Sequence, residues 1–206
     1  MGYDYLNFDR KDHNKRRNKL IAKILIWAVQ IVFVVGLAYF IVNYTLEKTL
    51  MIDSSMSPTL AENDIIIINK LSYWFSEPER YDIVVFSQSG KEHEYYNIKR
   101  IIGLPGETVL ISGGHVYING EILKGDIEAE EMLSAGIAET EITLEENEYF
   151  VLGDSRNNSE DSRFADIGTI VKSDIIGKAW IRTSPDFAFI SKLTKYKSTD
   201  EKNDTD

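Results

Sequence analysis

An uninterrupted apolar segment near the N-terminus constrains this chain more than any other feature. The nineteen residues from Ile24 to Val42 contain Gln30 as their one strongly polar side chain. A helix of this length, at about 1.5 Å per residue, reaches about 28 Å, close to the bilayer's hydrocarbon thickness of about 30 Å. A helix packed into a soluble core would show a polar stripe, which this segment lacks. The sequence therefore predicts a single transmembrane helix over residues 24–44.

The charge distribution predicts how that helix is oriented. Residues 1–23 hold seven Lys and Arg against three Asp, although the whole chain has a formal net charge of −10. Because basic flanks stay in the cytoplasm, we expect residues 1–23 to be cytoplasmic and the chain beyond residue 44 to lie outside the cell membrane. A cleaved signal peptide is the alternative, but the apolar run exceeds the usual span of about 7 to 15 residues and Val42–Thr45 offers no small-x-small cleavage site.

Composition excludes several classes of chemistry. The chain has no Cys, so disulfides, thiol nucleophiles and cysteine-bound metals are impossible. His13, His93 and His115 are widely separated and form no ligand pair; a site made of carboxylates alone stays open, but we expect neither a metal nor a cofactor. The 33 acidic against 23 basic residues argue against nucleic acid as a partner, because phosphate binding needs clustered cations. We expect a monomer.

The remainder of the chain is predicted to be mainly β. Residues 45–194 contain strand-length, β-branched runs, so we expect an exported antiparallel β-sheet or barrel-like domain behind the helix. These runs are Ile65–Ile68, Ile83–Phe86, Val109–Ile111, Phe150–Leu152 and Ile175–Ile181. Asn119-Gly120 predicts a type I′ hairpin turn, and Gly103–Gly106 fits a type II turn. A short helix is expected over residues 129–135, and residues 195–206 form a polar tail expected to be disordered.

Three polar stretches carry more information than a β-domain requires, and each also has a purely structural interpretation. In Asp53–Leu60, Ser57 would cap a short helix that has Pro58 at its first position. In Asn97–Gly103, strand alternation sends Lys99 and Arg100 to opposite faces; Lys99 is either an edge lysine or a buried amine with a lowered pKa. The stretch Gly153–Arg163 is either a solvated loop or a polar network, in which an Asp161–Arg163 pair with the hydroxyls of Ser159 and Ser162 holds a buried amine.

Taken in order behind the apolar segment, these stretches resemble the bacterial type I signal peptidases, membrane-anchored serine endopeptidases that remove signal peptides from exported preproteins. The compact spacing is similar to the Gram-positive type of this family. About three quarters of the chain takes part in the resemblance. The matching motifs are Ser55-Met56-x-Pro58-Thr59-Leu60, Asp82–Phe86, Lys99–Gly106 and Gly153-Asp154-x-Arg156-x-x-Ser159-x-Asp161-Ser162-Arg163.

The resemblance implies a serine/lysine dyad, with Ser55 as nucleophile and Lys99 as general base. It further implies that Ser159 orients the Lys99 amine and that the Ser55 N–H donates to the oxyanion. The supporting loop would be organised by Asp154, Arg156, Asp161, Ser162 and Arg163, and the substrate would be contacted near Met56, Pro58 and Asn97. The partners would be preproteins with small residues at positions −1 and −3, and a phospholipid membrane.

Four positions depart from the family pattern; Tyr81 and Glu107, in place of the more usual Gly and Asp, are expected to matter little, whereas Asp53 and Asn97 bear on the site. Asp53 stands where Gly or a hydroxyl residue is usual, and its carboxylate would repel an oxyanion, so the second donor stays unassigned with Ser54 as a candidate. Asn97 replaces a frequent aromatic residue, which puts the lining of the substrate pocket in doubt.

Other interpretations remain open at this point. The segment 73–75, Tyr-Trp-Phe, would either join the core or enter the membrane interface. A serine hydrolase using His93 or His115, a non-proteolytic accessory factor for exported proteins and a self-cleaving repressor-type protease are the alternative functions.

Overall fold

The structure is a computed structural model that describes residues 5–87, 96–126 and 130–193. The chain divides into two compact units, Met1–Tyr44 and Thr45–Asp206. Among the described residues, the first unit consists of a single helix, and most of the regular elements of the second unit are strands.

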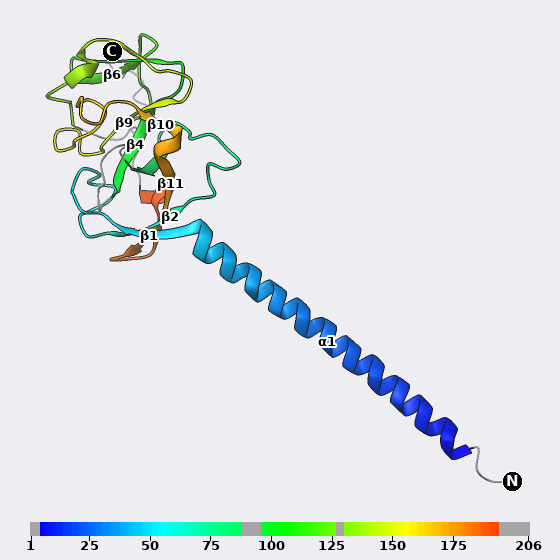
Figure 1. The fold of residues 1–206 in the computed structure, drawn as a ribbon. Helices are drawn as coiled ribbons and strands as arrows, with labels where there is room; N and C mark the ends of the chain where they lie inside the picture. The colour runs from blue at the N-terminus through cyan, green and yellow to red at the C-terminus, as the bar shows by residue number, and fades with distance from the viewer. Residues whose placement is uncertain (1–4, 88–95, 127–129, 194–206) are drawn as a thin grey trace, which may run out of the picture. The chain divides into compact units, whose positions relative to one another are not determined.

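Helix α1 runs from Tyr5 to Thr45 without interruption (Figure 1). It begins well before the predicted span, since residues 5–23 contain no proline that would interrupt the helix. Residues Lys15–Thr45 form a stretch long and apolar enough to cross a membrane, with a mean hydropathy of 2.5 in its most apolar window. Apolar side chains such as Trp27 and Phe33 are exposed, as expected of a helix that faces lipid rather than a protein core.

The larger sheet of the second unit is antiparallel throughout, which confirms the predicted fold class. Its strand order is β1-β2-β11-β3-β4-β9-β10, with β12 paired to β11, so the path is open and ends at β1 and β10. The strands are β1 (Leu46–Leu50), β2 (Ile65–Asn69), β3 (Ile83–Phe86), β4 (Asn97–Gly103), β9 (Glu148–Leu152), β10 (Ile170–Val171), β11 (Ile175–Ser184) and β12 (Ala188–Phe189). Strand β4 lies between β3 and β9, and six of its seven residues are buried.

A smaller antiparallel sheet has the order β7-β6-β5-β8. Its strands are β5 (Thr108–Ser112), β6 (His115–Ile118), β7 (Glu121–Ile122) and β8 (Ile142–Thr143). The predicted hairpin is present: Asn119 and Gly120 join β6 to β7 with φ values of 53° and 80°. The turn at Pro105 lies one residue later than expected, because the Glu107 N–H donates to the Leu104 carbonyl and Gly106 takes the positive φ.

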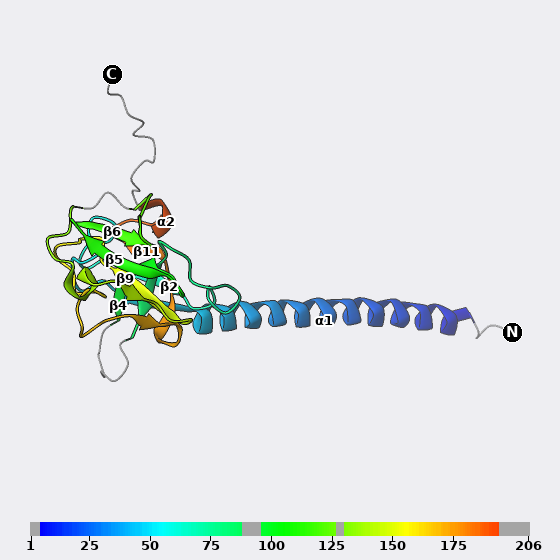
Figure 2. The ribbon, with the colours of Figure 1, turned by 90° about the horizontal axis from the view of Figure 1, so that it is seen from above.

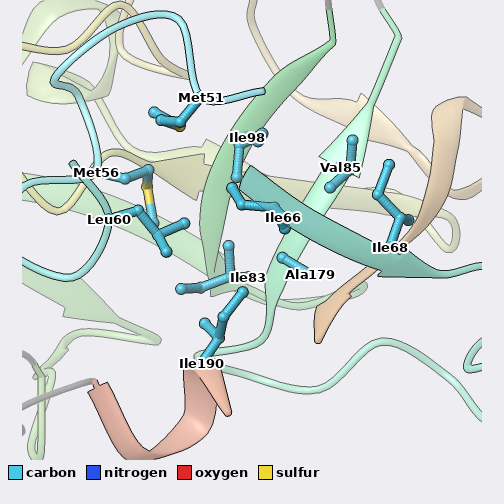
Figure 3. Packing of buried hydrophobic residues seen from close by; sticks show 10 residues of the cluster. All are labelled: Met51, Met56, Leu60, Ile66, Ile68, Ile83, Val85, Ile98, Ala179 and Ile190. Carbon is cyan, nitrogen blue, oxygen red and sulfur yellow. The ribbon is translucent and has the colours of Figure 1, made fainter. Parts of the chain in front are cut away.

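Three clusters of buried apolar side chains stabilise the second unit. The first lies around β2, β3 and the segment 51–60, and it includes Met56, Leu60 and Ile66 (Figure 3). The second joins the two sheets, since it combines residues of β4 and β9 with residues of β5 and β6, strands that run close together in Figure 2. The third includes Val84, Ile101 and Val151. The sheets therefore enclose β4 within apolar packing.

The expectation of a short helix over residues 129–135 was wrong for the described part of that segment. Residues 130–135 are irregular, and a 3-10 turn, η1, follows at Gly136–Glu139. The backbone N–H of Met132 donates to Gly114 and that of Leu133 to the Asn157 side chain, so these groups are committed to other segments instead of a helix. Two further short helices are η2 (Lys172–Asp174) and α2 (Ile190–Leu193). The expected tail lies outside the described residues.

Candidate active site

The structure brings together the two residues implied to form a dyad. Lys99 lies in the middle of β4, and Ser55 lies in the turn that follows β1, 44 residues earlier. The Lys99 Nζ and Ser55 Oγ atoms are 2.7 Å apart and share a hydrogen bond. Both side chains are almost completely buried, Lys99 with 2% and Ser55 with 3% of its surface exposed. Lys99 is therefore the buried amine of the two alternatives, and not an edge lysine.

Burial determines the protonation behaviour of Lys99. Removal from water lowers the pKa of the Lys99 amine below its ordinary value, because the charged form loses its hydration. The carboxylates of Asp53, Asp161 and Glu160 act in the opposite direction, but their effect on this pKa is smaller than that of burial. An amine with a lowered pKa is neutral in a larger fraction of molecules and can accept a proton from a hydroxyl.

The turn that carries Ser55 is anchored in the apolar core by two of its side chains. Met56 and Leu60 are fully buried, and the Leu60 N–H donates to the Met56 carbonyl. Ser57 does not cap a helix, because residues 53–60 form successive turns and its own N–H donates to the Ser54 carbonyl. The Ser55 carbonyl accepts a hydrogen bond from the Ser155 N–H, which ties the turn to the loop after β9.

A buried ion pair connects β4 to both segments of the site. The Arg100 guanidinium donates from Nε and Nη2 to the two carboxylate oxygens of Asp154, at 2.7 and 2.6 Å, and from Nη1 to the Tyr81 carbonyl. Thr59 Oγ1 donates to the same carboxylate at 2.5 Å. Asp154 therefore fastens the turn of Ser55 and the loop after β9 to the strand that holds Lys99. This contact of Thr59 was not predicted, although the residue lies within a quoted motif.

The predicted pair of Asp161 and Arg163 is present and fully buried. The Arg163 Nε and Nη2 atoms donate to the Asp161 carboxylate at 2.8 and 2.9 Å, and the Gly153 N–H donates to the same group. Ser162 closes the loop onto β9, because its Oγ accepts from the Val151 N–H and its N–H donates to the Val151 carbonyl. The loop 153–163 is thus a polar network and not a solvated surface loop.

Arg156 extends this network to a residue that sequence reasoning missed. Its two terminal nitrogens bind the carboxylate oxygens of Asp126 at 2.7 Å each, and its Nε donates to the Gly153 carbonyl. Arg163 in turn donates to the Arg156 carbonyl at 2.5 Å. No local pattern identifies Asp126, which lies 30 residues before Arg156 among several other acidic residues.

Ser159 lies at the site, but without the hydrogen bond expected of it. Its Oγ is buried and has no hydrogen-bond partner among the described residues, so the implied contact with the Lys99 amine is not made. Gly153 provides the space beside it: a Cβ at Gly153 would lie 2.2 Å from Ser159 Oγ and 2.6 Å from the Ser55 carbonyl oxygen. The hydroxyl therefore lies next to the main chain of Ser55 with its bonding capacity unused.

Asp53 contacts both members of the dyad. Its Oδ1 accepts a hydrogen bond from the Ser55 N–H at 2.9 Å, and its Oδ2 lies 4.0 Å from Lys99 Nζ. Ser54, the candidate second oxyanion donor, accepts a hydrogen bond on its Oγ from the Asn158 side chain at 2.8 Å.

The three residues expected to contact substrate have different surroundings. Met56 is buried in the first core cluster, so it supports the Ser55 turn from the protein side and does not reach solvent. Pro58 is exposed at the end of the same turn. Asn97 is half-buried at the start of β4, opposite Phe86.

The histidine alternative receives no geometric support. His115 begins β6 in the smaller sheet, whereas Ser55 shares its hydroxyl contact with Lys99. His93 and the side chain of His13 lie outside what the structure describes. Within residues 5–87, 96–126 and 130–193, no group of three or more His, Cys, Asp or Glu side chains is arranged to hold a metal ion.

In comparisons with known proteins, the family model, two relatives and a solved structure that match this chain are all signal peptidases. The family model described as signal peptidase, peptidase S26, matches residues 24–183. A probable signal peptidase I-2 of Synechocystis sp. is 40% identical over 154 residues, covering 72% of this chain and 68% of that protein. Signal peptidase I T of Bacillus subtilis is 35% identical over 173 residues, covering 79% and 86%. A crystal structure of a signal peptidase I from Enterococcus faecalis, 31% identical, covers 50% of this chain and 97% of its own, with a TM-score of 0.40.

The buried Arg100–Asp154 pair yields a prediction about stability. Asp154→Asn leaves the Arg100 guanidinium buried without its counter-ion, which should destabilise the protein by about 3 to 5 kcal/mol. Glu77→Gln, which removes an exposed partner of Lys172, is the matched control and should cost at most about 1 kcal/mol. Urea unfolding of the full-length protein in detergent micelles measures both. Equal stability of the two variants would contradict this assignment of Asp154.

Proposed function

The chain belongs to the signal peptidase family, peptidase S26, whose activity is the removal of signal peptides from preproteins, and we propose that it cleaves them with Ser55 as nucleophile and Lys99 as general base. It is a serine endopeptidase by that membership. The main support for this dyad is the 2.7 Å contact between Lys99 Nζ and Ser55 Oγ inside a buried site.

The chemistry of the dyad follows from the lowered pKa of Lys99. A neutral Nζ takes the proton of the Ser55 hydroxyl as Oγ attacks the scissile carbonyl carbon, because an unassisted serine hydroxyl is a poor nucleophile. The resulting tetrahedral intermediate collapses to an acyl-enzyme, and the ammonium of Lys99 gives its proton to the departing amine. A water molecule then attacks the acyl-enzyme, with Lys99 again acting as base, and Ser55 is restored.

The surrounding network supports this proposal by restricting both reacting groups. Asp154 links the Ser55 turn to β4 through Arg100 and Thr59, so a buried ion pair holds together the two segments that carry Ser55 and Lys99. We propose that the unpaired Ser159 hydroxyl accepts a hydrogen bond from the Lys99 ammonium once that group has taken the Ser55 proton. Ser159 is then a positioning residue for the charged form of the base.

Cleavage next to the membrane surface follows from the position of Ser55 in the chain. Ser55 lies ten residues after Thr45, so it cannot be more than about 35 Å from the end of the apolar span. The Thr45 carbonyl accepts a hydrogen bond from the Lys70 N–H, so the segment after β2 begins next to Thr45. Of the segment 73–75, Tyr73 packs against the third core cluster, whereas Trp74 and Phe75 are 74% and 87% exposed, so we propose that these two enter the interfacial layer of the lipid.

The proposed domain organisation places these parts in their compartments. Residues 1–23 are a basic cytoplasmic segment, residues 24–44 the membrane anchor and residues 45–194 the exported catalytic domain. The substrates are preproteins whose residues at −1 and −3 are small, presented as they emerge at the outer face of the cell membrane.

Cleavage of a labelled preprotein by the full-length protein in detergent tests the dyad. Ser55→Ala and Lys99→Ala should each lower cleavage by at least about a thousandfold, because each removes a member of the nucleophile and base pair. Lys172→Ala, which removes a half-buried lysine distant from the dyad in sequence, is the control and should retain full activity. An active, folded Lys99→Ala protein would rule out the dyad.

The pH dependence of cleavage tests the role of Lys99 as a neutral base. The value of kcat/KM should increase with pH as the amine loses its proton, and it should reach half of its maximum below the ordinary lysine value of 10.5, because burial lowers the pKa of Lys99. As the pH falls, the amine is protonated and activity is lost. A profile governed by a group near about 6.5 would instead favour a histidine base.

Membrane orientation is measured with single cysteines, which the cysteine-free chain allows without background labelling. A membrane-impermeant maleimide added to intact cells should label Glu62→Cys and leave Asn18→Cys unlabelled, because the basic flank stays inside. Lysed cells provide the control, in which both variants should react. Labelling of Asn18→Cys alone in intact cells would reverse the proposed orientation.

A further inference from the structure

Asp53 occupies a backbone N–H that the transition state of the cleavage reaction needs as a hydrogen-bond donor. Its Oδ1 is bound to the Ser55 N–H, the backbone donor nearest the nucleophile. In the proposed mechanism the substrate carbonyl oxygen becomes an anion that needs backbone donors at the site of attack, the Ser55 N–H among them. One N–H cannot serve a carboxylate and an oxyanion at full strength, and two negative charges at this point repel each other.

The position of the carboxylate between the two reacting residues is not explained by a local turn alone. An Asp side chain often accepts from the N–H two residues further along, which is an Asx turn and would be purely structural. Here the second oxygen of the same carboxylate lies 4.0 Å from Lys99 Nζ. The group therefore lies where a negative charge is held by a backbone N–H on one side and by the amine of the base on the other.

Asp53 is also able to leave this position. Its side chain is 61% exposed, in contrast to the buried carboxylates of Asp154 and Asp161. When the Asp53 side chain rotates toward solvent, its carboxylate exchanges one hydrogen bond and one long ion pair for contacts with water. The displaced carboxylate is therefore hydrated and does not become a buried, unpaired charge. Ser54, the next residue, can then act as an oxyanion donor. Its Oγ accepts a hydrogen bond from the Asn158 side chain, which leaves its hydroxyl proton available for donation.

We propose that the Asp53 carboxylate holds the oxyanion position in the free protein, so that Asp53 is a rate- and specificity-determining residue that every preprotein must displace before Ser55 can react. This inference rests on the proposed dyad. Preproteins that bind well enough to move the carboxylate are cleaved, whereas short or loosely bound peptides are cleaved poorly because the donor remains occupied.

The inference gives different expectations for three replacements of Asp53. Asp53→Gly frees the Ser55 N–H, and Asp53→Ser additionally supplies a hydroxyl donor. Both should raise the plateau value of kcat/KM by at least about tenfold, since hydrogen bonds to ionised groups change equilibria by about one to two powers of ten. Asp53→Asn retains an oxygen that can accept from the Ser55 N–H but lacks the charge, so its plateau should lie between those of the parent and Asp53→Gly.

The pH dependence of kcat/KM is a second measurement, and a purely structural role of Asp53 would leave it unchanged. Asp53, Asp161 and Glu160 are the carboxylates whose charge raises the pKa of Lys99 against the effect of burial. Removing the charge at Asp53 should therefore extend activity to lower pH as well as raise the plateau. Glu160→Gln is the matched control, because it also removes a charge that acts on Lys99 but leaves the Ser55 N–H in its contact with Asp53. It should shift the profile in the same direction with an unchanged plateau.

The experiment uses full-length protein in detergent with a labelled preprotein and with a short peptide that spans its cleavage site. Larger gains for the short peptide than for the preprotein in Asp53→Gly and Asp53→Ser support the inference. Unchanged or lower plateaus for both substrates, in variants whose unfolding midpoint equals that of the parent, would overturn it. Adding Ser55→Ala to each variant separates the two proposals: residual cleavage would refute the dyad, whereas complete loss together with no gain from Asp53→Gly refutes only the role of Asp53.

Discussion

Strand β4 buries two adjacent cations on opposite faces, and most of the second unit is arranged around this constraint. A buried charge must be paired or neutralised, because the desolvation cost of an isolated ion exceeds the stability of a domain. Arg100 cannot lose its proton, so it requires the carboxylate of Asp154. Lys99 can lose its proton; the Ser55 hydroxyl lies 2.7 Å from its amine, and the Asp53 carboxylate lies further away, at 4.0 Å. One strand therefore carries a permanent ion pair on one face and a group that titrates on the other.

The same constraint explains how the turn of Ser55 is held in place. Asp154 satisfies Arg100 and also accepts from Thr59, while its neighbour Ser155 donates to the Ser55 carbonyl. The loop after β9 is itself fixed by the buried pair of Asp161 and Arg163. This arrangement supports the dyad that we propose, because a hydrolase that activates a serine with a lysine needs the two groups at hydrogen-bond distance before the substrate arrives.

Sequence patterns predicted the features that depend on periodicity and turn chemistry. The apolar run predicted the helix, β-branched runs predicted the strands, and Asn119-Gly120 predicted a hairpin because those residues adopt positive φ. The partners of charged residues were harder to foresee, since the contacts of Arg156 with Asp126 and of Asp154 with Thr59 join distant segments and leave no local pattern. The segment 130–135 was misjudged because its N–H groups bind other loops, which tertiary structure decides. Whether Ser159 would be bonded also depends on side-chain distances that no spacing rule supplies.

Titration of the Lys99 side chain tests whether burial keeps this lysine available as a base at the Ser55 hydroxyl. Full-length protein with ¹³C-labelled lysine in detergent gives a signal for the carbon next to each amine, and Lys99→Arg identifies the one from Lys99. We expect this signal to titrate below 10.5, separately from the exposed lysines, because desolvation lowers the pKa of Lys99. A Lys99 signal that titrates together with the exposed lysines would contradict it.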